Sequence, residues 1–400
     1  MAARLPRRTF LGSLAALGGR LALPAGSSAA ALAQSGKLRD FARQAPVARW
    51  WVPMDKAACA DCHGQANLSG RALPSGHERA VRCGLCAHGC VLGEGRRGSC
   101  RARINVGGEL RSLVYGRPLT TAVDPIEKKP FYHFLPGSLA FSMATAGCPL
   151  RCRFCQNWQI SQASPEDART DFVPPSAIVA RAAASAPIVA FTYNEPTVFA
   201  EYLVDIARAA RKAGLRCVLV SCGFMNEEPL REMIEVLDAI KIDLKGFSSS
   251  FYRNVSGAEL APVLRSIKQV ARAGRHLELV NLVVPTLNDS ESGLSELVKW
   301  VAGELGPDVP LHFTRFHPDY LLMDLPPTPL ATLERAWELA KAQGLHHVYV
   351  GNVPNHAGNH TRCPKCGALC IERKGFFITA SRMKGSACAA CGTRLAGVWS

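Results

Sequence analysis

An alternation of strand-like and helix-like runs dominates the sequence from about residue 139. Helix-like runs lie between the strand-like ones, and three of them end at Gly214, Gly274 and Gly344, each directly before a strand. A strand–helix–strand repeat places successive strands parallel. The sequence therefore predicts an α/β fold with a parallel sheet, a full or partial (β/α) TIM-type barrel. The strand-like runs are Leu139–Thr145, Ile188–Tyr193, Cys217–Cys222, Ala239–Leu244, Leu277–Val284, Leu311–Phe316 and His347–Val350.

Composition excludes several classes of protein. With 48% hydrophobic and 20% charged residues, the chain has ordinary globular usage. We expect no transmembrane span, because no uncharged apolar run reaches the roughly 18 residues that one needs. The net charge of +15 suits anionic partners, but much of it is dispersed over helix faces without an aromatic–basic stripe, so nucleic acid is not the expected partner. The 16 cysteines are too sparse for a disulfide scaffold and too clustered for chance, which favours metal ligation.

One cysteine loop carries the most specific signal. Cys148, Cys152 and Cys155 have the spacing C-x3-C-x2-C and follow the first predicted strand of the repeat. Three thiolates in one loop can hold three corners of a [4Fe–4S] cluster and leave the fourth iron open to a small molecule. The alternatives are buried free cysteines or a zinc site that lacks one ligand, although structural zinc sites use four.

This loop, with Phe154 before its third cysteine, resembles that of the radical S-adenosylmethionine (SAM) superfamily. The resemblance implies that the open iron binds the amino and carboxylate groups of SAM. It also implies that the reduced cluster cleaves SAM to a 5′-deoxyadenosyl radical, which abstracts a hydrogen atom. An electron donor for the cluster is then required. The fold expected is a partial barrel of the radical SAM kind.

Polar residues at the ends of the predicted strands extend the resemblance, because active sites of such barrels lie there. Thr192–Pro196 resembles the superfamily's Gly-Gly-Glu-Pro element, but Tyr193 and Asn194 replace its two glycines, which places the close backbone approach in doubt. A lone Lys or His at a strand end is more often solvated or structural. The residues expected to contact SAM are Asn194, Glu195, Ser221, Asp243, Lys245 and His317.

Further motifs resemble one subgroup, the radical SAM enzymes of the AmmeMemoRadiSam system, which are related to pyruvate formate-lyase activating enzymes. The resemblance covers about residues 80–400 and implies a substrate that is a protein. The motifs are Asp124–Pro130, Tyr132–Gly137, Cys155–Trp158, Asp319-Tyr320, Tyr349–Asn352 and Gly397–Trp399.

Two C-x2-C-G knuckles near the C-terminus predict a zinc ribbon. Their ligands are Cys363, Cys366, Cys388 and Cys391, and a tetrahedral zinc site with four thiolates would stabilise a tail too short to fold alone. A rubredoxin-like iron site has the same geometry.

Two N-terminal cysteine groups are less specific. Cys83, Cys86, Cys90 and Cys100 suit either zinc or an accessory iron–sulfur cluster, with zinc favoured because no electron acceptor is evident; two disulfides are the remaining alternative. The other group, Cys59, Cys62 and His63, matches the attachment pattern of c-type haem. Chance or a zinc role is the favoured explanation of that match.

The first residues resemble a twin-arginine signal, with Arg7-Arg8 before an apolar stretch and Ala31-Leu32-Ala33 as the cleavage site. We therefore expect export to the periplasm in the folded state, with a cytoplasmic location as the alternative. The expected organisation is a signal peptide (1–33), a linker with the CxxCH pattern (34–82), a Cys-rich N-terminal cap (83–135), the barrel (136–355) and the zinc ribbon (356–400).

Two other functions compete with a glycyl-radical-activase-like enzyme. An RNA-modifying radical SAM enzyme is suggested by the basic charge and the ribbon. An exported haem or iron–sulfur electron carrier would use the same cofactors without SAM turnover.

Overall fold

The computed structural model describes residues 38–54, 79–168 and 170–400. The predicted signal peptide and the Cys59-Cys62-His63 pattern lie outside the described residues. In the part of the chain that is described, no helix is long and apolar enough to cross a membrane.

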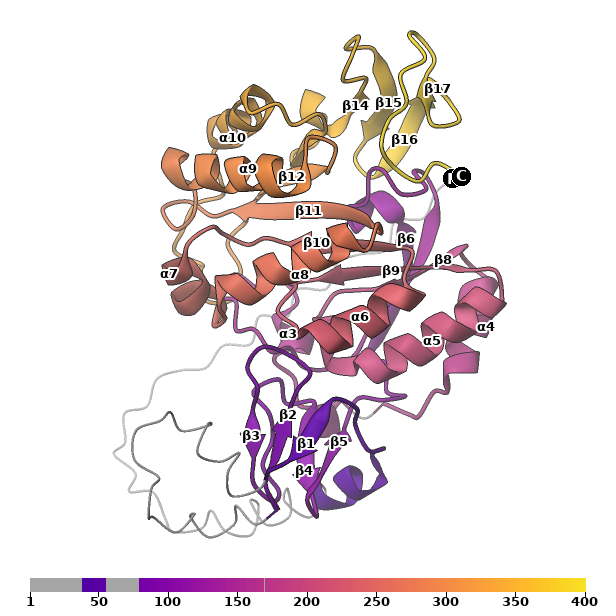
Figure 1. Cartoon of the computed structure of the whole chain (residues 1–400), viewed down its shortest axis with the longest axis vertical. Coiled ribbons are helices and arrows are strands. Elements are labelled where there is room, and N and C mark those ends of the chain that lie inside the picture. Colours follow the sequence, from indigo (N-terminus) through magenta and orange to yellow (C-terminus); the bar gives the residue numbers. More distant parts are fainter. Residues whose placement is uncertain (1–37, 55–78, 169) are drawn as a thin grey trace, which may run out of the picture.

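An eight-stranded sheet forms the centre of the molecule, in the order β13-β12-β11-β10-β9-β8-β7-β6 (Figure 1). The strands from β7 to β13 are all parallel, and β6 pairs with β7 in the antiparallel direction. This confirms the α/β class with a largely parallel sheet. The strands are β6 (Thr120–Pro125), β7 (Leu139–Ala144), β8 (Ile188–Phe191), β9 (Arg216–Ser221), β10 (Ala239–Asp243), β11 (His276–Val283), β12 (Leu311–Arg315) and β13 (Val348–Gly351).

Each strand from β7 to β13 lies within about one residue of a run predicted from sequence, apart from shorter C-terminal ends. Strand β6 was not predicted, and it lies in the range assigned to the Cys-rich cap. β6 is an edge strand, so its residues alternate between more and less exposed positions. It ends in Asp124 and Pro125 and contains no buried apolar run that would mark it in the sequence.

One layer of helices covers the sheet, and neighbouring helices contact one another in chain order. The largest hydrophobic core fills the space between this layer and the sheet. The longer helices are α4 (Pro175–Ala183), α5 (Ala200–Lys212), α6 (Glu227–Val236), α8 (Leu260–Arg272), α9 (Glu291–Leu305) and α10 (Leu330–Ala342). Shorter helical segments are η2 (Ile126–Lys128), α3 (Trp158–Ser161), η3 (Pro165–Asp167), η4 (Pro196–Phe199), α7 (Ser249–Phe251), η5 (Tyr252–Ser256) and η6 (Ala357–Asn359).

The Cys-rich N-terminal part packs below the sheet in Figure 1. It contains the antiparallel strands β1 (Trp51–Pro53), β2 (Val81–Cys83) and β3 (Val91–Leu92), and the hairpin β4 (Arg103–Val106) with β5 (Glu109–Ser112). The second strand of this hairpin ends at Ser112. Leu113 and Val114 leave the ladder because they are buried in two different hydrophobic cores.

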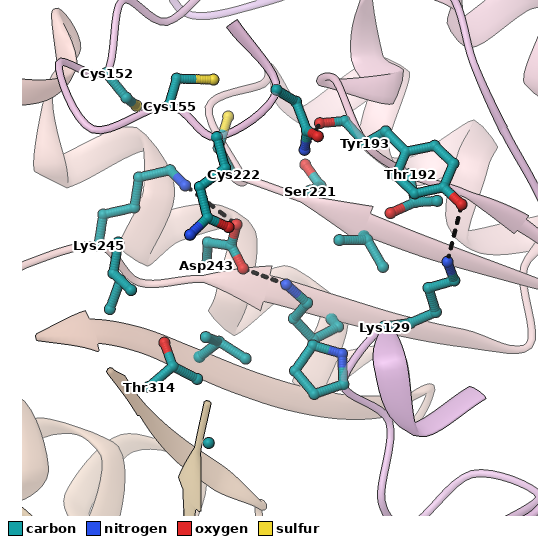
Figure 2. A pocket seen from close by; sticks show the side chains of 18 of the residues that line it. Lys129, Cys152, Cys155, Thr192, Tyr193, Ser221, Cys222, Asp243, Lys245 and Thr314 are labelled. Carbon is teal, nitrogen blue, oxygen red and sulfur yellow. Dashed lines mark hydrogen bonds and ion pairs between the residues drawn. The ribbon is translucent and has the colours of Figure 1, made fainter. Parts of the chain in front are cut away.

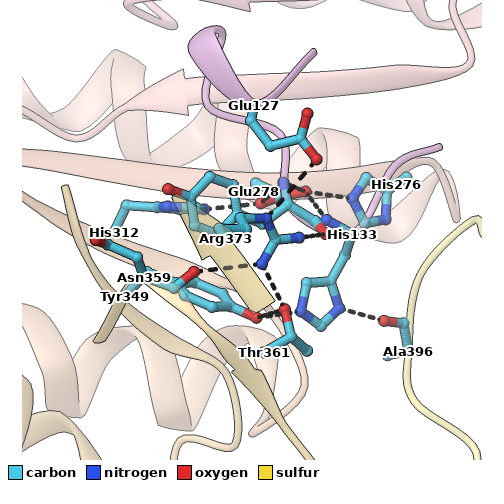
Figure 3. A network of polar contacts seen from close by, with 11 residues as sticks. Glu127, His133, His276, Glu278, His312, Tyr349, Asn359, Thr361, Arg373 and Ala396 are labelled. Carbon is cyan, nitrogen blue, oxygen red and sulfur yellow. Dashed lines mark hydrogen bonds and ion pairs between the residues drawn. The ribbon is translucent and has the colours of Figure 1, made fainter. Parts of the chain in front are cut away.

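The C-terminal part forms small antiparallel sheets beside β13 and β6. Its strands are β14 (Thr361–Arg362), β15 (Leu369–Lys374), β16 (Phe377–Ser381), β17 (Met383–Lys384) and β18 (Ala387–Cys388). The buried guanidinium of Arg373 joins it to the central sheet (Figure 3). Arg373 donates to the carbonyl oxygen of Tyr132 at 2.9 Å and to Thr361 Oγ1 at 2.8 Å, and its Nε lies 3.7 Å from Glu127.

A second buried charge fixes the segment between β6 and β7. The carboxylate of Glu278 on β11 accepts hydrogen bonds from the amides of Tyr132 and His133, and contacts His276 and His312 (Figure 3). Burial alone would raise the pKa of Glu278, but the two histidines hold it well below its usual range. These contacts place residues 126–137 against the sheet, where they form one wall of a cavity.

Candidate active site

A cavity of about 470 Å³ opens at the carboxyl ends of the parallel strands (Figure 2). The cysteine loop after β7, the ends of β8, β9 and β10, and β13 all contribute to its lining. A side chain from the ribbon, Phe376 in the turn between β15 and β16, completes the wall. The cavity therefore draws on segments more than 200 residues apart in sequence.

The three predicted cluster ligands, Cys148, Cys152 and Cys155, line this cavity together. Their loop is fixed by its own backbone, since Arg151 and Arg153 donate their amides to the π-helical segment η5, both at 2.9 Å. Burial and, secondly, the nearby carboxylate of Glu195 raise the pKa of the Cys148 thiol well above its ordinary value. Three thiols held on one cavity wall by a fixed loop fit a [4Fe–4S] cluster with an open iron.

Asn194 and Glu195 follow β8 and both line the cavity. Asn194 Nδ2 donates to the carbonyl oxygen of Gly147 at 2.8 Å, while its Oδ1 is buried without a hydrogen-bond partner. That free acceptor fits a donor such as an ammonium group in the cavity. Glu195 Oε1 accepts from Ser221 Oγ at 2.8 Å, and Oε2 accepts from the amide of Cys222 at 2.6 Å. Glu195 thus ties the ends of β8 and β9 together.

Asp243 and Lys245 meet at the end of β10, together with Lys241 (Figure 2). Asp243 pairs with both lysines. Burial opposes the charge of Asp243, yet the two ammonium groups lower its pKa to about 2. One carboxylate between two ammonium groups leaves a local excess of positive charge, which suits an anionic group in the cavity.

His317 is the one predicted SAM contact that does not join the others. It is exposed and does not line the cavity, because the chain leaves the sheet at Arg315, before it. His312, inside β12, lines the cavity instead and is buried.

The structure shows how Tyr193 can stand where the superfamily element has a glycine. Tyr193 adopts φ +69°, the left-handed region that glycine favours. Its hydroxyl donates to Asp124 on β6 at 2.6 Å, and Lys129 pairs with the same carboxylate at 2.7 Å. The edge strand thus holds a backbone conformation that costs a tyrosine on the order of 1 kcal/mol or more.

Several lining residues were not predicted from sequence. Lys241 and His312 lie inside strands and read as ordinary strand residues, and Phe376 lies in a distant turn, so no local signal marks any of them. Lys129 fell in a motif that was assigned no role. Cys222 was predicted only as the last residue of a strand, although its side chain lies with those of the cysteine loop in Figure 2.

The four ribbon cysteines converge. Their sulfur atoms all lie within 4.8 Å of one another, with 3.5 Å between Cys363 and Cys391 and 3.8 Å between Cys366 and Cys388. In the described ranges, this is the only such group of three or more His, Cys, Asp or Glu ligands. The prediction of a metal group with four cysteine ligands is therefore met in geometry, and this geometry suits zinc and iron equally.

The N-terminal cysteines behave differently. Cys83, Cys86, Cys90 and Cys100 line a second, smaller cavity, so the structure brings all four together. They do not reach the close spacing of the ribbon set. None is paired in a disulfide, in contrast to one of the alternatives left open by the sequence.

Comparison with known proteins agrees with this geometry. A family model described as the radical SAM superfamily matches residues 143–298, from β7 into α9. An uncharacterized protein of Methanocaldococcus jannaschii is 44% identical over 300 residues, which cover 75% of this chain and 89% of that protein. The chain belongs to the radical SAM superfamily.

More distant relatives indicate a branch of that superfamily. The pyruvate formate-lyase-activating enzyme of Listeria monocytogenes is 24% identical over 175 residues, 42% of this chain and 70% of that enzyme. The pyruvate formate-lyase 1-activating enzyme of Escherichia coli is 26% identical over 159 residues, 38% of this chain and 63% of that enzyme. The chain is thus homologous to pyruvate formate-lyase-activating enzymes, as its motifs suggested.

Solved structures show weaker likenesses. A domain of a pyruvate-formate lyase-activating enzyme from Bacteroides vulgatus has a TM-score of 0.37 at 18% identity, covering 41% of this chain and 98% of that one. SuiB of Streptococcus suis bound to S-adenosylmethionine has a TM-score of 0.43 at 13% identity, covering 57% and 53%.

Proposed function

We propose that this protein is a radical SAM enzyme that removes a hydrogen atom from a protein substrate. The observation that carries the proposal is the shared cavity: the three-cysteine loop and the polar ends of four parallel strands line one space of about 470 Å³. A cavity of that size suits a ligand such as SAM with part of a substrate.

Cys148, Cys152 and Cys155 would hold the [4Fe–4S] cluster. When bound, the cluster and SAM supply a 5′-deoxyadenosyl radical after transfer of one electron from a donor. The chain's own task is to orient the ligand and exclude water. Its loop is suited to this, because backbone hydrogen bonds fix it to η5 before any cofactor binds.

Some cavity residues would contact SAM, and others would hold those residues or the backbone in position. Asn194 Oδ1, buried and unpartnered, would accept a hydrogen bond from the SAM ammonium. Lys245 would face the SAM carboxylate or the cluster thiolates. Burial opposes its charge, but Asp243, Cys152 and Cys222 together raise its pKa well above the ordinary value. Glu195 would position Ser221 and the backbone of β9, because both of its oxygens already accept hydrogen bonds.

A protein substrate is supported by homology to enzymes that activate pyruvate formate-lyase. The cavity wall opposite the cysteine loop, formed by Lys129, Tyr132, His312 and Phe376, would then receive the substrate segment.

A SAM-cleavage assay tests the proposal. The anaerobically reconstituted full chain should form 5′-deoxyadenosine from SAM with a strong one-electron reductant. Cys152→Ala should abolish this product, whereas Cys217→Ala, which changes a buried cysteine on β9 outside the cavity lining, should not. Absence of 5′-deoxyadenosine from the wild type with a full cluster would contradict the proposal.

Two further assignments accompany it. The ribbon cysteines would bind one zinc ion, because two C-x2-C-G knuckles are typical of a zinc ribbon and the four sulfur atoms, all within 4.8 Å of one another, can surround a tetrahedral metal ion. The twin-arginine-like start would direct export after the cofactor is inserted, since an unfolded chain would bring bare thiols into an oxidising compartment.

A further inference from the structure

The second cysteine cavity adjoins the active site. Pro149 lines it together with Cys83, Cys86, Cys90 and Cys100, while its neighbours Cys148 and Leu150 line the large cavity. Alternate residues of one loop therefore face two cysteine-lined spaces. Only the thickness of this loop separates the two sets of thiols.

The N-terminal cysteine segment and the loop of Cys148 are in direct contact. Gly147 has φ +93°, and a side chain at this position would collide with the carbonyl oxygen of Cys100. On the other side of the loop, His88 Nε2 is hydrogen-bonded to the carbonyl oxygen of Pro149 at 2.9 Å. The segment that carries the N-terminal cysteines is thus packed onto the segment that carries Cys148.

The N-terminal sulfur atoms are spaced differently from those of the ribbon. A Zn–S bond of about 2.3 Å places tetrahedral thiolates about 3.8 Å apart, as in the ribbon. Over the described residues, no three of the N-terminal sulfur atoms lie within 4.8 Å of one another, and the same holds for the loop of Cys148, Cys152 and Cys155. Wider spacing is expected where iron and sulfide separate the thiolates.

One buried side chain points to an anionic group in this cavity. Arg103 lines the cavity, is 1% exposed, and pairs with Glu201. Its Nε has no hydrogen-bond partner. A buried donor without a partner is costly, so a sulfur acceptor of a bound cluster would satisfy it.

We propose that Cys83, Cys86, Cys90 and Cys100 bind an iron–sulfur cluster that relays electrons to the active site. This assignment replaces the zinc favoured by the sequence alone. The cluster takes one electron from a low-potential one-electron donor protein, of the iron–sulfur or flavin class, and passes one electron on to the Cys148 site. The donor is oxidised by one electron, and no bond or proton changes. The relay rests on the proposed function, but the cluster does not.

Metal analysis of paired variants tests the assignment on the anaerobically reconstituted full chain. Cys152→Ala removes the active-site ligand set and leaves the N-terminal set intact, whereas Cys86→Ala/Cys100→Ala does the reverse. Cys217→Ala is the matched control for loss of a buried cysteine. Iron, acid-labile sulfide and zinc are measured in each, with Mössbauer spectra to identify clusters.

We expect Cys152→Ala to keep two to four iron atoms and as many sulfides per chain, and the double variant to lose that number, both with zinc unchanged. If the double variant does not fold, Cys152→Ala alone decides, because a folded chain without iron overturns the proposal. Loss of zinc with unchanged iron in the double variant also overturns it, in favour of a structural zinc site.

Electron paramagnetic resonance tests the relay without turnover. In the reduced wild type, two paramagnetic clusters across one loop should broaden each other's signals, and either variant should abolish that broadening. Two clusters without magnetic interaction would overturn the relay. A cluster in Cys152→Ala together with a wild type that cannot cleave SAM would overturn the proposed function and leave the N-terminal site standing.

Discussion

Replacement of Arg373 should destabilise the junction between ribbon and sheet through the carboxylate that it leaves behind. Arg373 and Glu127 are both fully buried, and Nε lies 3.7 Å from the carboxylate. The guanidinium also donates to the carbonyl oxygen of Tyr132 and lies 4.0 Å from the centre of its ring. Removing one member of such a buried pair costs about 3–5 kcal/mol. We expect Arg373→Met to lose that amount of unfolding free energy.

The double variant Arg373→Met/Glu127→Gln separates charge from packing. Glutamine keeps the acceptor that Gly137 uses at 2.9 Å, but carries no charge. It should therefore recover about 1–3 kcal/mol of the loss. Urea unfolding of both variants, with zinc content measured to show that the ribbon holds its metal, gives the difference directly.

The pH dependence of this difference tests whether the carboxylate charge is the cause. Burial already raises the pKa of Glu127, and Arg373 opposes that shift. In Arg373→Met the folded chain therefore keeps a proton on Glu127 that the unfolded chain releases. The free energy of unfolding is highest below the unfolded pKa of about 4.5, and it falls as pH rises through the folded pKa of Glu127. The gap between single and double variants should widen by up to about 1.4 kcal/mol per pH unit as pH rises from about 4.5 towards the folded pKa of Glu127. A gap that is absent, or that narrows with rising pH, refutes the reasoning.

Four other changes have defined outcomes. Cys366→Ser should release one zinc per chain and make the region beyond about residue 356 sensitive to proteolysis; loss of SAM binding in the same sample would show that the ribbon and sheet do not fold separately. Tyr193→Phe should cost about 1–2 kcal/mol in urea unfolding, because a 2.6 Å hydrogen bond to a carboxylate is lost, and equal stability would contradict that role. His347 is buried and its pKa is lowered to about 4, mainly by burial; this group should therefore cost the wild type up to about 3 kcal/mol as pH falls from 6.5 to 4. Burial also lowers the pKa of His133 and His312, so His347→Leu should have a shallower slope than the wild type over this range, and an unchanged slope would contradict the assignment. Replacing Arg7 and Arg8 together by Lys should hold a full-length, cluster-loaded protein in the cytoplasm, and its appearance in a periplasmic fraction would exclude the twin-arginine route.

The sequence predicted those parts of the fold that leave a local pattern. Strands buried on both faces appear as continuous apolar runs, so β7 to β13 and their parallel direction could be predicted. The edge strand β6 could not, since half of its residues face solvent. Its role is also non-local: Asp124 acts through Tyr193, which is 69 residues away.

The same limit applies to the site residues: those with a local sequence pattern were predicted, and the others were not. Cysteine spacing identified three loop residues and four ribbon residues that the structure brings together. His317 was chosen because it follows a predicted strand, but β12 ends at Arg315 and the residue that faces the cavity is His312. Alternation along a strand sets which side a residue faces, and a one-residue error in the strand's end is enough to select the wrong histidine.

The wall made by Phe376 has a consequence for the order of assembly during synthesis. The ribosome completes the cysteine loop and the sheet before the ribbon, so the cavity exists with one side missing while residues 361–400 are still being made. The ribbon closes that side when Arg373 docks and Val398 exchanges backbone hydrogen bonds with His133 and Leu135. We therefore expect cofactor loading to have a more open route before the ribbon docks than after it.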